Sequence, residues 1–180
     1  MRAFLALSLS DDQRGALSDL QDHLRCGRIV DEDDLHLTLV FFAQAGRDAL
    51  EELDLTLGLR RPGPAQVAFR GLSVFGSANP RSVHAAVVPD PRLMHLQAGL
   101  ASAARRCGIA LPHRRFVPHV TLARFAHRMP PEDHARLGRF LSAHGDARLP
   151  ADVAADLHLY RSTLHPDGPR YDLLESYPLA

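Results

Sequence analysis

Two short segments of this chain pair a histidine with a threonine two residues later. The pairs are His36 with Thr38 and His119 with Thr121, and each lies in an otherwise apolar stretch. Residues i and i+2 of a β-strand point to the same face, so each histidine would share a face with its threonine. Histidine can take or give a proton near neutral pH, since its ordinary pKa is about 6.5. A threonine hydroxyl can donate a hydrogen bond to an anion.

Two such pairs around one phosphate could hydrolyse a phosphodiester without a metal. The reaction needs a base for the attacking group, an acid for the leaving oxygen, and donors that hold the non-bridging oxygens. His36 and His119 suit the proton transfers, and Thr38 and Thr121 suit the oxygens. A cyclic phosphate, whose ring oxygen is the leaving group, fits an in-line displacement between the pairs. A single His-x-Thr strand usually marks only a polar face, so the inference depends on the duplication.

The apolar pattern predicts the elements that would carry these side chains. Ser10 and Gln13 match a capping box at a helix start. Asp90 caps a later helix with Pro91 at its first position, where a missing N–H costs nothing. We expect helices at about 11–26, 48–59, 91–107 and 131–143, and strands at 4–9, 35–42, 65–75, 82–88, 120–125, 153–164 and 171–179.

The order of these elements repeats. A strand, an acidic cap, a helix, a glycine stop, a loop and a His-x-Thr strand occur at 4–42 and again at 82–125. Two βαβ-like lobes related by a pseudo-twofold axis would bring both motif strands to the middle, facing one cleft. No low-complexity segment or linker interrupts the chain. We therefore predict an α/β (α+β) fold, with residues 1–180 as a single domain of two pseudo-symmetric lobes.

Charge and cysteine content limit the class of protein. Lysine plus arginine and aspartate plus glutamate both number 21, so the net charge is zero and bulk charge does not hold this chain on nucleic acid. A local basic cleft is still compatible with this balance. No stretch approaches about 18 continuous apolar residues, which predicts no transmembrane helix, and the N-terminal apolar run is too short for a signal peptide. We expect a cytoplasmic monomer with Cys26 and Cys107 as free thiols.

Metal and cofactor motifs are missing from the sequence. No two histidines have the His-x-x-x-His spacing of a helical zinc site, no cysteine accompanies them, and there is no glycine-rich phosphate loop. We therefore expect neither a metal nor a cofactor. The acidic run 31–34 offers a separate hypothesis. Carboxylates close to His36 would favour its imidazolium and hence an acid role, whereas a solvated loop would leave it unaffected.

The motifs have a counterpart in a known family. His-Leu-Thr-Leu at 36–39 and Pro-His-Val-Thr-Leu-Ala-Arg at 118–124 resemble the paired motifs of the two-histidine (2H) phosphoesterases. The nearest likeness is to the RNA 2′,3′-cyclic phosphodiesterases, historically named 2′-5′ RNA ligases. Residues 1–7 resemble that family's opening strand, 72–75 its central strand, and 159–171 its closing hairpin. The resemblance therefore covers nearly the whole chain.

This resemblance implies a 2H phosphoesterase fold, with two antiparallel sheets flanking a central cleft and helices outside. It implies metal-free hydrolysis of 2′,3′-cyclic phosphate ends of RNA, or of small cyclic nucleotides, to 2′-phosphomonoesters. His36 would be the general acid toward the ribose 3′ oxygen and His119 the general base for water. Thr38 and Thr121 would hold the phosphate with help from Arg124. The near-symmetry of the motifs also allows the two histidines to exchange roles.

Several positions around the motifs are less determined. Simple alternation puts Arg124 on the strand face opposite Thr121, unless the strand bends or ends there. Arg114 and Arg115 are either a solvated pair or phosphate ligands. Phe42, or a loop aromatic such as Phe116, could stack on a base. The sequence departs from the family pattern at three places: it has Val40-Phe41-Phe42-Ala43 in place of Lys-Phe-Leu-Gly, Val117 in place of an arginine, and His84 in place of a tryptophan.

Three other functions are compatible with parts of this pattern. RNA ligation would run the same chemistry in reverse on a 2′,3′-cyclic end and a 5′-hydroxyl, with the same acid and base. A non-catalytic module that binds nucleotides or RNA ends would keep the cleft, but it would not require two titratable groups. A two-lobed domain with His-x-Thr strands by chance would explain neither the duplication nor its context.

Overall fold

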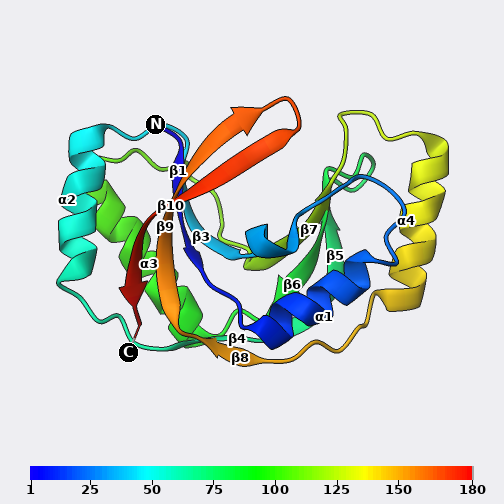
Figure 1. The fold of residues 1–180 in the computed structure, drawn as a ribbon, viewed down its shortest axis with the longest axis horizontal. Helices are drawn as coiled ribbons and strands as arrows, with labels where there is room; N and C mark the ends of the chain where they lie inside the picture. Colours follow the sequence, from blue (N-terminus) through cyan, green and yellow to red (C-terminus); the bar gives the residue numbers. More distant parts are fainter. Residues whose placement is uncertain (180) are drawn as a thin grey trace.

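Two halves of an antiparallel sheet meet at the His-x-Thr strands, β3 (Leu37–Phe42) and β7 (His119–Arg124). The computed structural model describes residues 1–179, and Figure 1 shows its ribbon. Seven strands follow the order β10-β9-β1-β3-β7-β6-β5, and β2 pairs with β7 as the eighth. The ladder between β3 and β7 is one pair, Leu37 with Val120, and the two halves spread apart on either side of it.

The observed elements agree closely with the predicted ones. The other strands are β1 (Ala3–Leu7), β2 (Arg28–Ile29), β4 (Ala65–Val67), β5 (Phe69–Phe75), β6 (Ser82–Val87), β8 (Asp152–Ala154), β9 (Asp156–His165) and β10 (Gly168–Pro178). The helices are α1 (Asp11–Gln21), α2 (Arg47–Gly58), α3 (Pro91–Arg106) and α4 (Pro131–His144), with a 3-10 turn η1 (Glu32–Asp34). The mixed α/β prediction is confirmed. The strand expected at 65–75 divides, and β4 pairs with β8 in a separate two-stranded sheet.

Helix α1 begins as predicted but ends earlier. The capping box of Ser10 and Gln13 is present. The helix stops at Gln21 instead of continuing to Gly27, because the chain turns back there to form β2. The two residues of β2 lie opposite Arg124 and Ala123 of β7. Nothing in the apolar pattern of this short segment predicts a strand.

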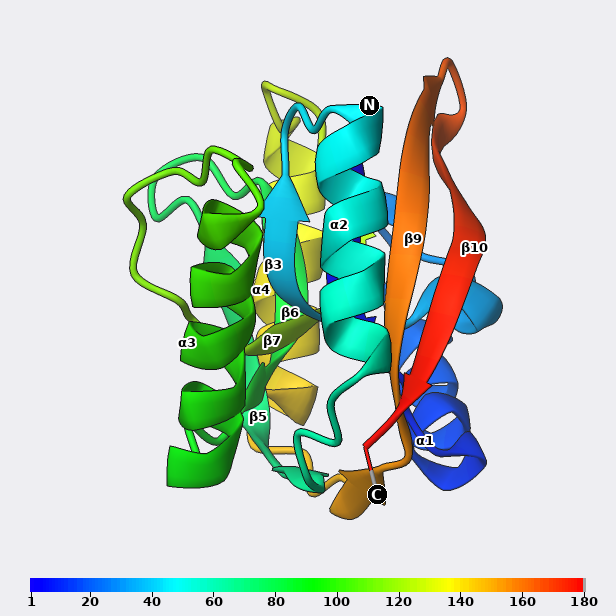
Figure 2. The same ribbon diagram turned by 90° about the vertical axis from the view of Figure 1, so that its left-hand side faces the viewer.

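The helices bury the leucine stripes expected from their spacing. Helices α2 and α3 lie side by side on the outside of the β1–β3 half, as Figure 2 shows. Their buried leucines are Leu50, Leu53, Leu57, Leu93, Leu96 and Leu100. Each buried leucine stabilises the fold by about 1.5–3 kcal/mol relative to an exposed one. Cys26 and Cys107 are buried free thiols, which confirms that prediction. Within residues 1–179, no helix combines the length and the apolar character needed to cross a membrane.

The two repeat units exchange their helices. The order β1-α1-β3 is matched by β6-α3-β7 along the chain. Yet α1 packs against β7, and α3 packs against β3. Each motif strand is thus backed by the helix that precedes the other one. This exchange ties the two halves together beyond the single strand pair at their junction.

Strand β3 carries a β-bulge three residues after its histidine. Leu5 of β1 pairs with Val40, and Ala6 pairs with Thr38, so Leu39 is an extra residue without a partner on β1. A bulge interrupts the period of two, so that residues three apart come to the same face. The face of Thr38 therefore continues at residue 41 instead of at residue 40.

Strand β7 carries the same bulge at the equivalent position. Val83 of β6 pairs with Ala123, and His84 pairs with Thr121, so Leu122 is the extra residue. Leu122 and Ala123 are accordingly both buried although they are adjacent. The bulge carries the face of Thr121 on to residue 124. The strand thus bends, and this bend lets Arg124 share the face of Thr121.

The bulge in β3 generates a prediction about stability. Phe42 is fully buried with 0% exposure, whereas Phe41 is only half-buried. We expect Phe42→Ala to lower the free energy of unfolding by about 3–5 kcal/mol, because it leaves a cavity in the core. Phe41→Ala should cost less than half as much. Urea unfolding followed by circular dichroism measures both values, and equal losses would contradict the bulge.

Candidate active site

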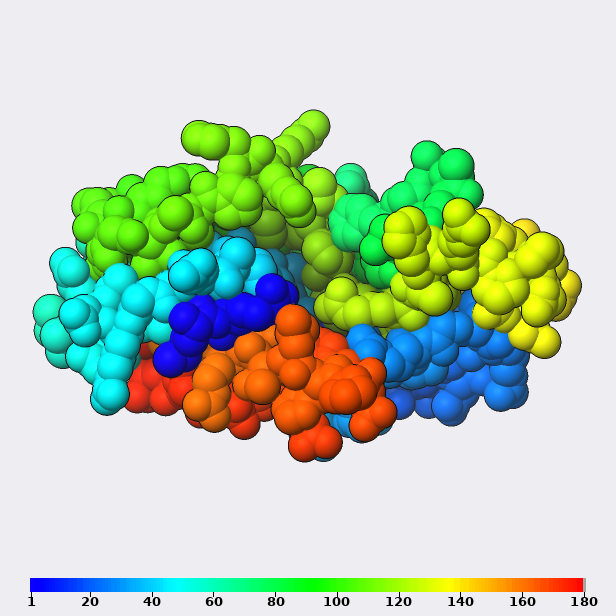
Figure 3. All heavy atoms as spheres, turned by 90° about the horizontal axis from the view of Figure 1, so that it is seen from above, coloured from blue at the N-terminus to red at the C-terminus, as the bar shows by residue number. Residues whose placement is uncertain are grey.

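The two histidines line one cleft in the middle of the sheet. Its volume is about 610 Å³, and Thr38, Thr121 and Arg124 line it with them. Its walls come from both halves of the sheet, and seen from above the surface is hollowed near the middle, beside the β9–β10 hairpin (Figure 3). The cleft therefore brings together the five side chains that the sequence suggests for acid–base work and phosphate binding.

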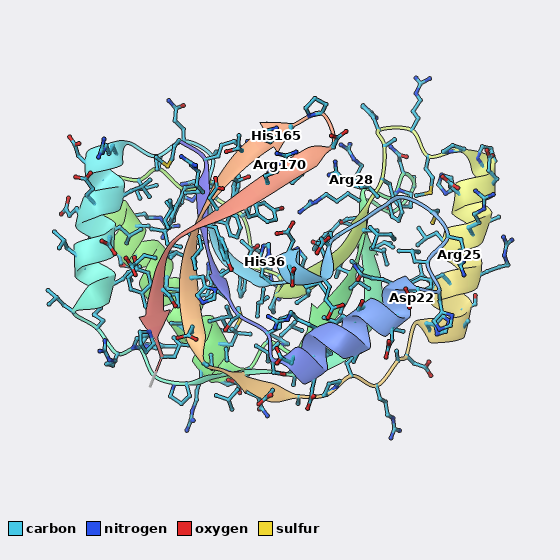
Figure 4. The ribbon with its side chains drawn as sticks, in the orientation of Figure 1. Asp22, Arg25, Arg28, His36, His165 and Arg170 are labelled. Atoms are coloured by element: carbon cyan, nitrogen blue, oxygen red, sulfur yellow. The ribbon has the colours of Figure 1, made fainter. Side chains whose placement is uncertain are left out.

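His36 is held by hydrogen bonds at both ring nitrogens. Its Nδ1 donates to the Asp34 carbonyl oxygen at 2.7 Å, which leaves Nε2 to accept the Thr38 hydroxyl at 2.9 Å when the ring is neutral. Phe4 stacks on the ring at 4.8 Å between centroids, and Tyr171 meets it edge-on at 5.4 Å. These contacts hold the ring in one orientation, with Nε2 at its threonine. Figure 4 labels His36 near the middle of the molecule.

His119 is held in a closely similar way. Its Nδ1 donates to the Val117 carbonyl oxygen at 2.7 Å, again two residues earlier in the chain. Phe75 meets the ring edge-on at 4.8 Å, and His84 lies 5.1 Å away. In the neutral ring Nε2 is then the nitrogen with a free lone pair. Both histidines thus keep Nε2 for proton transfer.

Burial controls the charge of these histidines. It lowers the pKa of His36 to about 4, helped by the positive charges of Arg124 and His119 and opposed by the Asp34 carbonyl. Burial also lowers the pKa of His119, with Arg124 acting in the same direction and the Val117 carbonyl against it. Both rings are therefore neutral at pH 7. A nearby anion would raise either pKa again.

The acidic run acts on His36 through the backbone. Burial raises the pKa of Asp34, and the neighbouring Asp31 and Asp33 carboxylates raise it further. The contact of Asp34 with His36 is its carbonyl oxygen, and the pKa of His36 falls overall. No carboxylate of residues 31–34 is among the groups that shift the pKa of His36, so the hypothesis that these carboxylates favour the imidazolium is not supported. Only the Asp34 carbonyl oxygen acts in that direction, and burial outweighs it.

Positive charge gathers in the cleft although the chain as a whole is neutral. Arg2, Arg28, Arg114 and Arg124 line it, whereas Asp34 is the one carboxylate among its lining residues. None of these four arginines forms an ion pair with a carboxylate within residues 1–179. Arg28, labelled in Figure 4, reaches across to the hairpin and donates to the Asp167 carbonyl oxygen at 3.0 Å. The cleft therefore suits a ligand with more than one negative charge.

The bulge in β3 corrects the expected stacking residue. Phe42 lies in the core with 0% exposure and cannot reach a base. Phe41 lines the cleft instead, and the Arg2 guanidinium lies 5.0 Å from its ring centre. Phe116 packs against the core and is not among the lining residues, and neither is Arg115.

Other residues in or beside the cleft escaped the sequence argument. Tyr171 on β10 and Phe75 on β5 reach the histidines from distant parts of the chain, and no local pattern indicates this. His84 is 3% exposed, its Nδ1 has no partner within residues 1–179, and burial next to His119 lowers its pKa to about 4. The one available signal was the polarity of His84 in an apolar strand. No group of three or more metal-ligating side chains occurs in the described part of the chain.

Comparison with protein families identifies the chain. A sequence model of the 2′-5′ RNA ligase superfamily matches residues 8–163. This chain belongs to that superfamily. A Methanothermobacter thermautotrophicus relative named RNA 2′,3′-cyclic phosphodiesterase is 29% identical, covering 99% of each chain. A Thermus thermophilus relative of the same name is 30% identical, covering 99% of this chain and 90% of the relative.

Solved structures of superfamily members share the fold. TT0787 of Thermus thermophilus is 28% identical, with a TM-score of 0.76 over 99% of this chain and 98% of that one. E. coli LigT complexed with 3′-AMP is 24% identical, with a TM-score of 0.77 over 99% and 97% of the two chains. The 2H phosphoesterase fold expected from the motifs is thereby confirmed.

The lowered pKa values generate a prediction about pH dependence. If the two histidines act as acid and base, one ring must be protonated and the other neutral, but burial lowers both pKa values and keeps both rings neutral near pH 7. A bound phosphate favours an imidazolium and raises both pKa values. We expect the pH optimum of kcat, which reports the complex, to lie above that of kcat/KM, which reports the free enzyme. Steady-state rates between about pH 4 and pH 9 measure both, and coincident optima would contradict this expectation.

Proposed function

We propose that this protein hydrolyses 2′,3′-cyclic phosphate ends of RNA to 2′-phosphomonoesters without a metal. The observation that carries the proposal is the pair of imidazoles that line one cleft with each Nδ1 bound to a backbone carbonyl. Each ring then keeps Nε2 for proton transfer, as an acid and a base on one phosphate require. The relatives named RNA 2′,3′-cyclic phosphodiesterase support the choice of substrate.

The proposed reaction is an in-line displacement at phosphorus. His119 Nε2 takes a proton from water, and the water oxygen bonds to phosphorus. The bond from phosphorus to the ribose 3′ oxygen breaks, and His36 Nε2 protonates that oxygen. The 2′ ester bond stays, so a 2′-phosphomonoester leaves. Both histidines return to their starting states by exchanging one proton each with solvent.

The threonines and Arg124 would stabilise the charge that builds up on phosphorus. Thr38 and Thr121 donate O–H groups to the non-bridging oxygens, and Arg124 offers a charged fork of N–H donors. The Thr38 hydroxyl donates to His36 Nε2, so binding of a phosphate would exchange that hydrogen bond for one to the substrate. The same exchange frees Nε2 to carry a proton.

The arginines favour an RNA end over a single nucleotide. A mononucleotide 2′,3′-cyclic phosphate carries one negative charge, whereas an RNA end adds one for each further phosphodiester. The cleft supplies four arginines against one carboxylate. Phe41, with Arg2 on its ring, would provide a stacking surface for the terminal base.

Ligation in the reverse direction uses the same groups. A 5′-hydroxyl would replace water, with His119 as its base and His36 as the acid for the departing 3′ oxygen, and the 2′,3′-cyclic end would be joined through a 2′-5′ linkage. The superfamily to which the chain belongs carries the name of this activity. A binding module without turnover is less well supported, because two buried and oriented imidazoles exceed what binding requires.

The proposed function is tested with an oligoribonucleotide that ends in a 2′,3′-cyclic phosphate. We expect turnover to a 2′-phosphate in the presence of EDTA. His36→Ala and His119→Ala should each lower kcat by about 100-fold to 10,000-fold, since each removes one proton transfer. Product mapping by mass spectrometry and phosphatase treatment distinguishes the 2′- from the 3′-phosphate.

Different results of that assay point to different alternatives. Loss of turnover in EDTA would refute the metal-free reaction, and a 3′-phosphate product would reverse the assignment of the leaving oxygen. Tight binding without turnover would favour the binding module. Joining after a 5′-hydroxyl RNA is added would show that ligation competes with hydrolysis.

Phe41 generates a separate prediction about base recognition. Phe41→Leu should raise KM for a cyclic nucleotide by about 5-fold to 100-fold with little change in kcat, as expected for a lost stacking contact. Ribose 2′,3′-cyclic phosphate, which has no base, is the control substrate and should be unaffected. Equal effects on both substrates would show that Phe41 shapes the cleft and does not stack.

A further inference from the structure

A glutamine side chain binds each bulge of the motif strands. Gln21, at the end of α1, donates from Nε2 to the Leu122 carbonyl oxygen at 2.9 Å. Gln97, in the middle of α3, donates from Nε2 to the Leu39 carbonyl oxygen at 3.3 Å. Leu122 and Leu39 are the extra residues of the two strands. Both contacts cross between the repeat units, because each helix packs on the other unit's motif strand.

Gln21 is the stronger of the two contacts. Its side chain is 6% exposed, and the same Nε2 also donates to the Val30 carbonyl oxygen at 2.7 Å. The Val30 N–H in turn donates to the Leu122 carbonyl oxygen at 2.9 Å. One amide group thus joins the end of α1, the segment after β2 and the bulge of β7. It uses both of its N–H donors on backbone carbonyls.

We propose that Gln21 is a positioning residue for Arg124: it stabilises the bulge at Leu122, and that bulge turns the arginine into the cleft. Without the extra residue, alternation would place residue 124 on the face opposite Thr121. Arg124 does line the cleft with Thr121, so the bulge accounts for its position. Gln97 holds the equivalent bulge in β3, where residue 41 takes the place of residue 124.

The catalytic part of this inference rests on the proposed function. If Arg124 holds the phosphate, loss of Gln21 should weaken catalysis through Arg124 and through no other group. A general loss of structure would act whether or not the arginine is present. A double-mutant cycle separates these cases, because coupled residues give non-additive effects.

Gln13 provides a matched control on the same helix. It is 1% exposed, and its Nε2 likewise donates to two backbone carbonyls, Val67 at 2.9 Å and Pro150 at 3.1 Å. It lies away from the cleft and contacts neither bulge. Gln13→Met therefore removes two bonds of the same kind, together with the capping-box bond from the Ser10 N–H, without touching β7.

The experiment measures kcat/KM on the cyclic-ended oligoribonucleotide for Gln21→Met, Gln13→Met and Arg124→Ala, and for each glutamine variant combined with Arg124→Ala. We expect Gln21→Met to lower kcat/KM by about 10-fold to 100-fold, as for a displaced substrate-positioning group. In the Arg124→Ala background it should change the rate by less than about 2-fold. Gln13→Met should lower the urea midpoint but leave kcat/KM of the folded protein unchanged.

Three results would overturn the inference. These are an unchanged kcat/KM in Gln21→Met, the same fold-loss with and without Arg124, or an equal loss in Gln13→Met. If Gln21→Met does not fold, Gln21→Asn, whose amide is too short to reach the bulge, takes its place.

Binding of inorganic phosphate separates this inference from the proposed function. The same cycle is measured by calorimetry as the Kd for phosphate, which needs no turnover. If Gln21→Met weakens phosphate binding in the wild-type background but not in the Arg124→Ala background, the positioning role is supported. This holds even if the protein does not hydrolyse cyclic phosphates. Unchanged phosphate binding together with unchanged turnover would refute it.

Discussion

The geometry of the cleft depends on one extra residue in each motif strand. In a regular first motif strand, residues 36, 38, 40 and 42 would share one face. In a regular second motif strand, residues 119, 121 and 123 would share one face. The bulges at Leu39 and Leu122 shift the pattern, so that Phe41 and Arg124 follow their threonines into the cleft. An unpaired bulge costs ladder hydrogen bonds, and two glutamine side chains supply part of the replacement.

The same arrangement explains why both histidines are fixed in orientation and why both have a lowered pKa. Packing against aromatic rings and a backbone carbonyl fixes each imidazole, but it also removes water that would stabilise its charge. The cleft therefore holds two neutral imidazole rings beside several arginines. Entry of a phosphate changes the balance, because its charge stabilises an imidazolium. Under the proposed function, binding of the phosphate would therefore also raise the pKa of the histidine that acts as the acid.

Much of the fold could be predicted from the sequence, because its signals are local. Capping at Ser10 and Asp90, leucine spacing in the helices and the repeated His-x-Thr strands indicated the elements and their order. The residues that the sequence misplaced or missed depend on contacts between distant parts of the chain. Phe42 was suggested as a stacking residue and is buried, because alternation does not reveal the bulge in β3 that Gln97 of α3 contacts from outside. Tyr171 and Phe75 reach the site only because the two halves of the sheet meet at one pair of residues.

The internal symmetry also shows where the two halves have diverged. Histidine, threonine and the extra leucine recur at the same spacing, whereas the fifth position after the histidine is Phe41 in one half and Arg124 in the other. An aromatic ring and a guanidinium at equivalent points make the two sides of the cleft different, and the Phe41 ring carries the Arg2 guanidinium beside it. A symmetric pair of arginines would bind phosphate without regard to direction. Phe41 and Arg124 break that symmetry, and under the proposed function this difference would give the two similar histidines different roles.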